Sequence, residues 1–268
     1  MKRILLAGAA LVALTVAQPA FAADAPYLRG SLVAAPFNWS GFYIGANGGY
    51  GWHTGRVELL TDDVTPPNNL GEATAASRGT IGNIQALGWF AGGQLGYNWL
   101  FGPSVLVGIE ADLQSSRING SLVGTFTNPN GTVAINGNAN FNMDWFGTLR
   151  GRVGAVADGW LLYATGGLAY GHVAYNMFAL ETGGGALFQS VLSGSGTKFG
   201  YVVGAGVEYA FTSNLTLKGE YQYINLGSIS ATGLVTPIGG GVPTGETATL
   251  QSIDAAFHTL RVGLNWKL

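Results

Sequence analysis

Eight segments of the chain alternate apolar residues with small or polar ones, and a period of two is the pattern of strands with two different faces. The first segment begins at Phe42 and ends at His53, and its apolar face carries Ile44, Tyr50 and Trp52. The other segments are 89–99, 105–114, 141–153, 160–171, 198–209, 215–223 and 259–268. We therefore expect an all-β chain, because no apolar run beyond the N-terminus is long enough for a membrane-spanning helix.

The composition narrows the class of protein. Of 268 residues, 44 are glycine and 47% are hydrophobic. Only 10% are charged, against about 25% in a typical soluble domain. These values disfavour both an ordinary cytosolic enzyme and a disordered chain. The chain has no cysteine, which excludes disulfides, cysteine-ligated metals and thiol nucleophiles. A net charge of −2 gives no support for nucleic-acid binding.

The N-terminus has the layout of a cleaved export signal. Lys2 and Arg3 precede an apolar run over residues 4–17, which is followed by the small-residue cleavage site Ala20-Phe21-Ala22. The alternative is an uncleaved anchor helix, but the run is shorter than the ~20 residues that a spanning helix needs. We predict a signal peptide over 1–22, a periplasmic leader over 23–38 and a barrel over 39–268.

An exported chain of alternating strands predicts an eight-stranded, antiparallel, up-and-down transmembrane β-barrel, because a closed sheet leaves no backbone group unpaired in lipid. The connections favour this topology, since short and long ones take turns along the chain. The short ones are expected at the periplasmic rim and lie at 101–104, 157–159 and 212–214. The long ones are expected to be outer loops and lie at 57–83, 116–139, 176–197 and 227–252.

The charged residues of the segments share the face opposite the apolar one. In a transmembrane barrel this face points into the lumen, whereas a soluble lipocalin-like carrier would turn it to water and pack large aromatic rings inside. We favour the first arrangement, because Arg or Lys at the midplane of a lipid-facing wall costs about 2 to 4 kcal/mol. Five acids and five bases then predict a lumen filled by ion pairs, with a selective ion path as the alternative. The predicted lumen network is Glu110, Asp112, Asp144, Arg150, Arg152, Glu208, Lys218, Glu220, Arg261 and Lys267.

Large aromatic residues fall near both ends of the predicted strands. Trp and Tyr gather where a membrane-spanning wall meets the lipid headgroups, whereas rings that only fill a soluble core would not form two bands. The periplasmic girdle is predicted to contain Trp99, Trp160, Tyr209 and Trp266. The outer girdle is predicted to contain Trp52, Trp89 and Trp145.

Several ordered motifs resemble those of a known family. They include Trp39-Ser-Gly-Phe-Tyr-Ile-Gly, Asp144-Trp-Phe-Gly-Thr-Leu-Arg-Gly-Arg-Val-Gly and Arg261-Val-Gly-Leu-Asn-Trp-Lys. From Trp39 onward the chain is similar to the small outer-membrane immunogenic, porin-like barrels of alphaproteobacteria, which share their fold with the OmpA transmembrane domain and the opacity proteins. The resemblance implies a surface protein that supports envelope integrity and whose outer loops meet host factors. Haem binding by the outer loops is a minor option that the resemblance adds.

The same resemblance implies the partners. They are outer-membrane lipid and lipopolysaccharide, host or environmental ligands at the loops, and the assembly machinery that reads the C-terminal strand. No nucleic acid is expected. Barrels of this type usually end in Phe, whereas this chain ends in Leu268, so slower assembly is expected.

No catalytic residue, cofactor or metal site is predicted. His53, His172 and His258 fall near the outer ends of strands, where solvation at the rim is the simplest role for them. Contact of these histidines with haem or a metal is one alternative. A catalytic set that adds Ser252 and Asp254 is another, but the period of two turns His53 inward and His258 outward.

Overall fold

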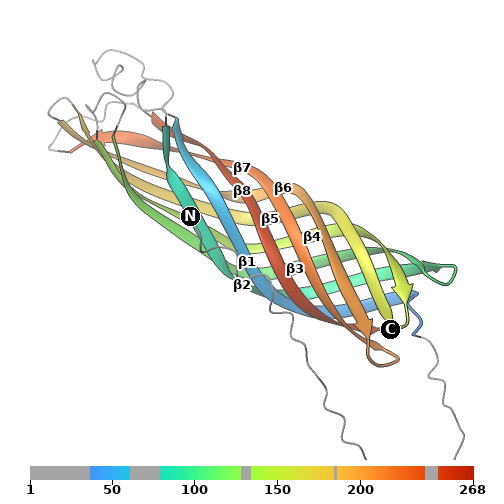
Figure 1. Ribbon diagram of the computed structural model, residues 1–268. Coiled ribbons are helices and arrows are strands. Elements are labelled where there is room, and N and C mark those ends of the chain that lie inside the picture. Colours follow the sequence, from blue (N-terminus) through green and yellow to red (C-terminus); the bar gives the residue numbers. More distant parts are fainter. Residues whose placement is uncertain (1–36, 61–78, 128–133, 184–185, 239–246) are drawn as a thin grey trace, which may run out of the picture. The chain divides into compact units, whose positions relative to one another are not determined.

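The computed structural model describes residues 37–60, 79–127, 134–183, 186–238 and 247–268. Eight strands pair in sequence order, each antiparallel to the next, and the last strand pairs with the first to close a barrel (Figure 1). The strands are β1 Gly41–Leu60, β2 Gly79–Phe101, β3 Val105–Thr127, β4 Ala134–Ala157, β5 Trp160–Gly183, β6 Ala186–Ala210, β7 Leu215–Pro237 and β8 Thr247–Lys267. The predicted eight-stranded antiparallel up-and-down barrel is thus confirmed. Among the described residues, no helix is long and apolar enough to cross a membrane. The predicted signal peptide and residues 23–36 of the predicted leader lie outside the described residues.

Three short turns mark one end of the barrel, which we call the turn end. In the turn between β4 and β5, Asp158 and Gly159 have φ angles of 47° and 84°. Two successive positive φ angles give the backbone twist that a two-residue hairpin needs, and Asp-Gly is a favoured pair for it. Lys267 donates its backbone N–H to the carbonyl oxygen of Asn214 in the turn between β6 and β7, so the C-terminus lies at the same end (Figure 1).

The strands are much longer than the sequence pattern predicts. They contain 20 to 25 residues, and most of the residues expected in the outer loops continue the sheet instead. For example, residues 121–127 of β3 pair with residues 134–140 of β4. At about 3.3 Å per residue and a tilt of about 40°, such strands rise roughly 50 to 60 Å, about twice the ~25 Å height of a lipid-facing band. The predicted bounds of the outer loops are therefore wrong where they fall on described residues, since Gly, Asn, Ser and Thr form strand here and not only turns. Residues 61–78 of the first predicted loop lie outside the described residues.

A β-bulge changes which face the outer part of β4 presents. The pairing shifts between Met143 and Trp145 on β4. The facing shift between Ser115 and Ile118 on β3 leaves the alternation of inward and outward residues along β3 unchanged. One extra residue reverses the inward and outward positions that follow it, because the side-chain period is two. Phe141 and Met143, predicted on the lipid-facing side with Trp145, are consequently buried inside the barrel.

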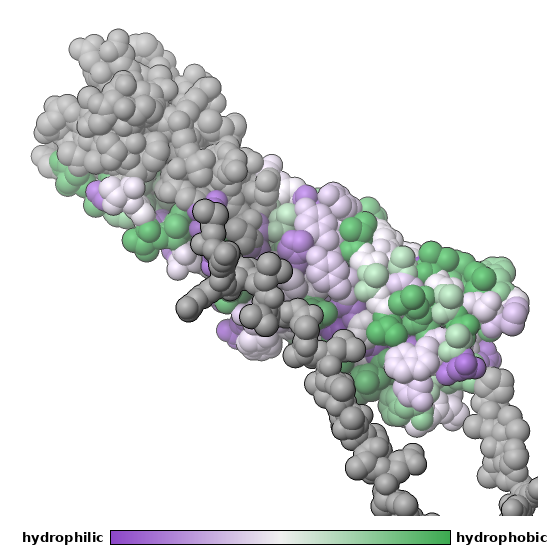
Figure 2. All heavy atoms as spheres, viewed as in Figure 1, coloured by the Kyte–Doolittle hydropathy of each residue, from purple (hydrophilic) through white to green (hydrophobic). Residues whose placement is uncertain are grey.

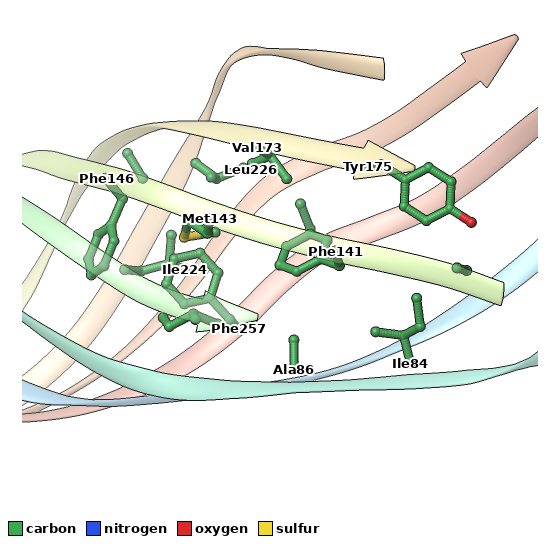
Figure 3. Packing of buried hydrophobic residues seen from close by; sticks show 14 of the residues in the cluster. Ile84, Ala86, Phe141, Met143, Phe146, Val173, Tyr175, Ile224, Leu226 and Phe257 are labelled. Carbon is green, nitrogen blue, oxygen red and sulfur yellow. The ribbon is translucent and has the colours of Figure 1, made fainter. Parts of the chain in front are cut away.

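The barrel therefore has two halves of opposite polarity. In the half next to the turn end, the turn half, outward residues such as Ile44, Leu95 and Ile109 are apolar and exposed, while the inward residues are polar. Figure 2 shows hydrophobic side chains covering much of the surface near the C-terminus. In the other half, the loop half, the interior is an apolar cluster in which Phe141, Met143, Ile224 and Phe257 lie toward one another (Figure 3). Its outer surface carries mostly Asn, Gln, Ser and Thr.

Close packing of backbone against backbone predicts which glycines the barrel requires. A Cβ at Gly92 of β2 would overlap the carbonyl oxygen of Leu113 and lie 2.8 Å from the Cα of Gln114, whereas at Gly93 its nearest neighbour would be 3.7 Å away. We expect Gly92→Ala to lower the free energy of unfolding by about 1–3 kcal/mol through overpacking. Gly93→Ala is the matched control and should leave stability nearly unchanged. The measurement is the fraction of folded, heat-modifiable protein on unboiled gels across a urea series, and equal losses for both variants would contradict this packing.

Candidate functional site

Eight of the ten charged residues predicted to line the lumen lie buried together in the turn half. They come from β3, β4, β6, β7 and β8, and the exposed fraction of each side chain is at most 3%. The eight comprise four acids and four bases, so their formal charge sums to zero. The residues are Glu110, Asp112, Arg150, Arg152, Glu208, Lys218, Glu220 and Arg261. We call this set the lumen network.

Glu110 on β3 lies at the centre of the lumen network. Lys218 Nζ on β7 is 2.8 and 2.9 Å from the two carboxylate oxygens of Glu110. Arg150 donates to Oε1, and Tyr43 Oη on β1 donates to Oε2 at 2.6 Å. Because β3 and β7 are four strands apart in a ring of eight, the pair of Lys218 and Glu110 joins opposite walls of the barrel.

Two arginines extend this bridge across the lumen. Arg150 Nη1 on β4 lies 2.7 Å from Glu220 Oε1 on β7, and Arg261 Nη1 on β8 lies 3.0 Å from Asp112 Oδ2 on β3. Arg261 also reaches Glu220 at 2.5 Å. Glu110, Asp112 and Glu220 thus each meet two or more cations, which compensates their removal from water.

A second centre lies nearer the turn end. Arg152 Nη1 is 3.1 Å from Glu208 Oε2, and Arg152 also donates to the side-chain oxygen of Asn98 at 2.8 and 2.9 Å. Its guanidinium lies between the rings of Tyr43 and Tyr163, at 4.8 and 5.3 Å from their centroids. Tyr43 on β1 and Tyr163 on β5 face each other across the barrel, so this stack closes the lumen between a second pair of opposite walls.

An aromatic cluster covers the lumen network at the turn end. Trp39 is only 3% exposed and packs with Leu106 and Leu161, while the ring of Phe37 lies 4.8 Å from the ring of Trp39. Between Trp39 and Glu208 a cavity of about 10 Å³ remains. A space of that size holds about one water molecule. On the opposite side, the lumen network borders the apolar cluster of the loop half.

Two members of the predicted network are not part of it. Asp144 is exposed on the outer surface, so its prediction as a lumen residue is wrong. The cause is the bulge between Met143 and Trp145, which turns Asp144 outward. Lys267 is half-buried at the turn end, where its Nζ lies 5.8 Å from the ring of Phe37, and it contacts none of the lumen carboxylates within the described residues.

The seven predicted girdle residues all lie on the outer wall. Six are exposed and Trp145 is half-buried. Near the turn end, the ring centroids of Trp160 and Tyr209 are 4.5 Å apart. Farther along the strands, Trp89 pairs in register with Tyr50, and Trp52 lies 6.4 Å from Tyr221. The level of the lipid headgroups at these two girdles remains a prediction.

The three histidines do not form a joint site. His53 is buried, contacts the carbonyl oxygen of Ala256 and stacks on Phe141 at 5.6 Å. His258 lies on the opposite face of the sheet, where its Nδ1 is 2.6 Å from Tyr221 Oη. His172 stacks on Trp145. Within the part of the chain that the structure describes, no three His, Asp or Glu side chains are placed to hold a metal ion.

Several contributors to the lumen were not predicted from the sequence. Tyr43 and Tyr163 hydrogen-bond to Glu110 and Glu220, each at 2.6 Å. Their inward positions were readable, because each lies on the small or polar side of its alternating segment. The position of Trp39 over the turn end could not be predicted from the sequence, because Trp39 precedes the first strand and belongs to no alternating segment.

The chain is similar in sequence to known outer-membrane proteins. The chain matches the family described as outer membrane protein beta-barrel domain over residues 8–267. It is 34% identical to a 31 kDa outer-membrane immunogenic protein of Brucella melitensis over 273 residues, covering 100% of both chains. It is 32% identical to a 22 kDa outer membrane protein of Rhizobium leguminosarum bv. viciae, over 69% of this chain and 64% of the relative.

Solved structures of outer-membrane proteins are also similar. The crystal structure of OprG from Pseudomonas aeruginosa has a TM-score of 0.42 and 12% identity, covering 87% of this chain and 99% of that one. The outer membrane protease OmpT from Escherichia coli has a TM-score of 0.40 and 12% identity, covering 84% and 97%.

Charge balance in the lumen network predicts a non-additive response to mutation. Glu110→Gln leaves its cationic neighbours short of one negative charge, and we expect a loss of about 3–5 kcal/mol in the free energy of unfolding. Adding Lys218→Met removes one excess charge, so the double variant should lose less than the sum of the two single losses. The measurement is urea unfolding of the refolded barrel, followed by tryptophan fluorescence and gel mobility.

Asp144→Asn provides the control for this series. Its carboxylate is exposed, so we expect a change within about 0.5 kcal/mol. Strictly additive losses in the lumen series, or an effect of Asp144→Asn as large as that of Glu110→Gln, would contradict the assignment of these charges.

Proposed function

The chain belongs to the outer membrane protein β-barrel family, and on this premise we propose that it is a closed structural barrel that supports the envelope and presents its outer surface to ligands, without catalysing a reaction. The observation that carries the proposal is the neutral lumen network, which links opposite walls of the ring in the turn half. By the usual orientation of such barrels, the turn end lies in the periplasm and the loop half projects outward.

Three successive layers support a closed lumen. Trp39 and its neighbours cover the turn end, the lumen network fills the middle, and Phe141, Met143 and the rest of the apolar cluster fill the loop half. An ion would have to separate buried ion pairs and then cross the apolar cluster, whose described side chains are mostly hydrocarbon and cannot replace the hydration shell of the ion. An eight-stranded barrel has an interior just wide enough for side chains to fill.

A role without catalysis agrees with the positions of the candidate groups. His53 is enclosed by the apolar interior and His258 packs among the aromatic rings of the outer wall. A general base needs to lie within hydrogen-bond reach of the proton it takes, and these two side chains face opposite sides of the sheet. Haem binding by the outer loops, the minor option drawn from the resemblance, stays a prediction, because the connections at the loop end, 61–78, 128–133, 184–185 and 239–246, lie outside the described residues.

Planar-bilayer recording tests the closed lumen. We expect no stable conductance steps of porin size from the wild-type protein. The alternative, a small porin-like channel, instead expects stable steps whose ion selectivity changes with Arg150→Ala and not with Asp144→Asn, because only the first residue lies in the lumen. Stable conductance steps of the wild-type protein, with an ion selectivity that changes with Arg150→Ala, would contradict the closed lumen and support the channel.

Loss of the protein from its own cells tests the envelope role. We expect a deletion strain to become more sensitive to detergents and large antibiotics, and the wild-type protein to restore resistance. The Asp144→Asn variant should restore resistance fully, and Glu110→Gln should restore it in proportion to the amount of folded barrel. Unchanged sensitivity in the deletion strain would exclude a supporting role in the envelope.

A further inference from the structure

Asparagine occupies every second position along the outer part of β4. Asn136, Asn138, Asn140 and Asn142 share one face of the strand, and all four lie on the outer surface of the loop half. Alternate residues of a strand are about 6.7 Å apart, so the four carboxamides form a row about 20 Å long. We call this row the asparagine row. The bulge beyond Asn142 separates it from Leu149 and the rest of the lipid-facing wall.

The fold explains only part of the asparagine row. Asn136 accepts a hydrogen bond from Thr125 Oγ1 on β3 at 2.7 Å, whereas Asn138, Asn140 and Asn142 have no such partner among the described residues. Asn is depleted in strands, and an exposed strand is better served by Thr or by a β-branched residue. Asn ladders stabilise stacked copies of a strand when identical strands pair in register. That role does not apply here, because β4 already pairs with β3 on one side and β5 on the other and has no free edge. Three such residues in alternation, Asn138, Asn140 and Asn142, therefore point to a ligand.

The neighbouring strands add hydrogen-bonding groups of the same kind. A groove of about 600 Å³ runs over β2, β3 and β4 and is lined by Gln85, Asn119, Ser121, Asn140 and Asn142. Its side chains carry no charge. Carboxamides and hydroxyls both donate and accept hydrogen bonds, which is the pattern that the hydroxyl groups of sugars complement.

Exposed apolar side chains border the asparagine row. Asn138 pairs in register with Val123 on β3 and Phe178 on β5, which are 81% and 39% exposed. Asn140 pairs with Asn176 on β5. A neutral row of carboxamides beside an exposed aromatic ring combines polar groups for sugar hydroxyls with an apolar face for the sugar ring.

The row begins directly above the predicted outer girdle. Trp145 is the girdle residue of β4, and Asn142 follows it toward the loop end, so the row rises from the level of the lipid headgroups. We propose that the asparagine row and its groove bind the saccharide part of lipopolysaccharide that is anchored in the lipid beside the barrel. This inference deepens the ligand-presenting part of the proposed function and does not depend on the closed lumen.

Binding measurements with the wild type and two variants test the proposal. The triple variant Asn138→Thr/Asn140→Thr/Asn142→Thr removes three carboxamides and favours the strand, so the barrel should still fold. The matched control, Ser193→Ala/Ser195→Ala, changes exposed outward residues of β6. Each protein in zwitterionic detergent is titrated with purified lipopolysaccharide, with lipid A, which lacks the core and outer-chain sugars, and with a soluble extracellular polysaccharide. Heat-modifiability and bilayer conductance are recorded on the same samples.

We expect the wild type and the β6 control to bind lipopolysaccharide at least tenfold more tightly than lipid A. The triple variant should lose this preference and keep its affinity for lipid A, because only hydrogen bonds to the sugars are removed. The inference is overturned if the triple variant keeps the preference, if the wild type has none, or if the soluble polysaccharide binds more tightly than lipopolysaccharide. Conductance by folded wild-type protein would overturn the closed barrel alone, so the two failures are distinguishable.

Discussion

In hydrocarbon, each backbone amide and carbonyl of a strand must find its hydrogen-bond partner within the protein. The pairing of β8 with β1 meets this requirement by closing the sheet, and the other features of the turn half follow from closure. A closed wall of eight strands has an outer face for lipid and an interior with little room for solvent. Charges can enter that interior only with partners, and Glu110, Arg150, Lys218 and the rest of the lumen network supply one another. The family and the outer-membrane location predicted from the sequence are both confirmed.

The sequence predicted the turn half well because an uninterrupted period of two holds there. Glu110 and Glu220 alternate with outward apolar residues and lie where the pattern put them. Asp144 was misplaced because a bulge changes the face of a strand without leaving a distinct sequence signal. The outer parts of β3 to β6 were taken for loops, since they are rich in Gly, Asn, Ser and Thr. Cross-strand pairing and an apolar interior outweigh that local composition.

The two halves of the sheet have different surroundings, and the polarity of each half follows from them. In the turn half, lipid outside selects apolar outward residues and leaves the polar ones to pair within. In the loop half, polar outward residues and an apolar interior reproduce the arrangement of a water-soluble barrel, in which the hydrophobic effect stabilises the interior. Gln114 and Gln222 lie inside the barrel between Asp112 and Glu220 on one side and the apolar cluster on the other. A soluble carrier has an apolar interior and a polar outer surface. We rejected this arrangement for the whole chain, but it describes the polarity of the loop half.

The lumen network is balanced along the chain as well as across the barrel. The carboxylates of β3, Glu110 and Asp112, are offset by the two arginines of β4, and Glu110 and Arg150 are direct partners in the pairing of these strands. On the other side, Glu208 lies opposite Lys218 in the pairing of β6 with β7, and Glu220 lies opposite Arg261 in the pairing of β7 with β8. The β3–β4 hairpin and the three strands β6 to β8 are therefore each neutral in these residues before the barrel closes. A partly inserted chain that contains only the β3–β4 hairpin, or only β6 to β8, therefore brings no net charge from these residues into the membrane.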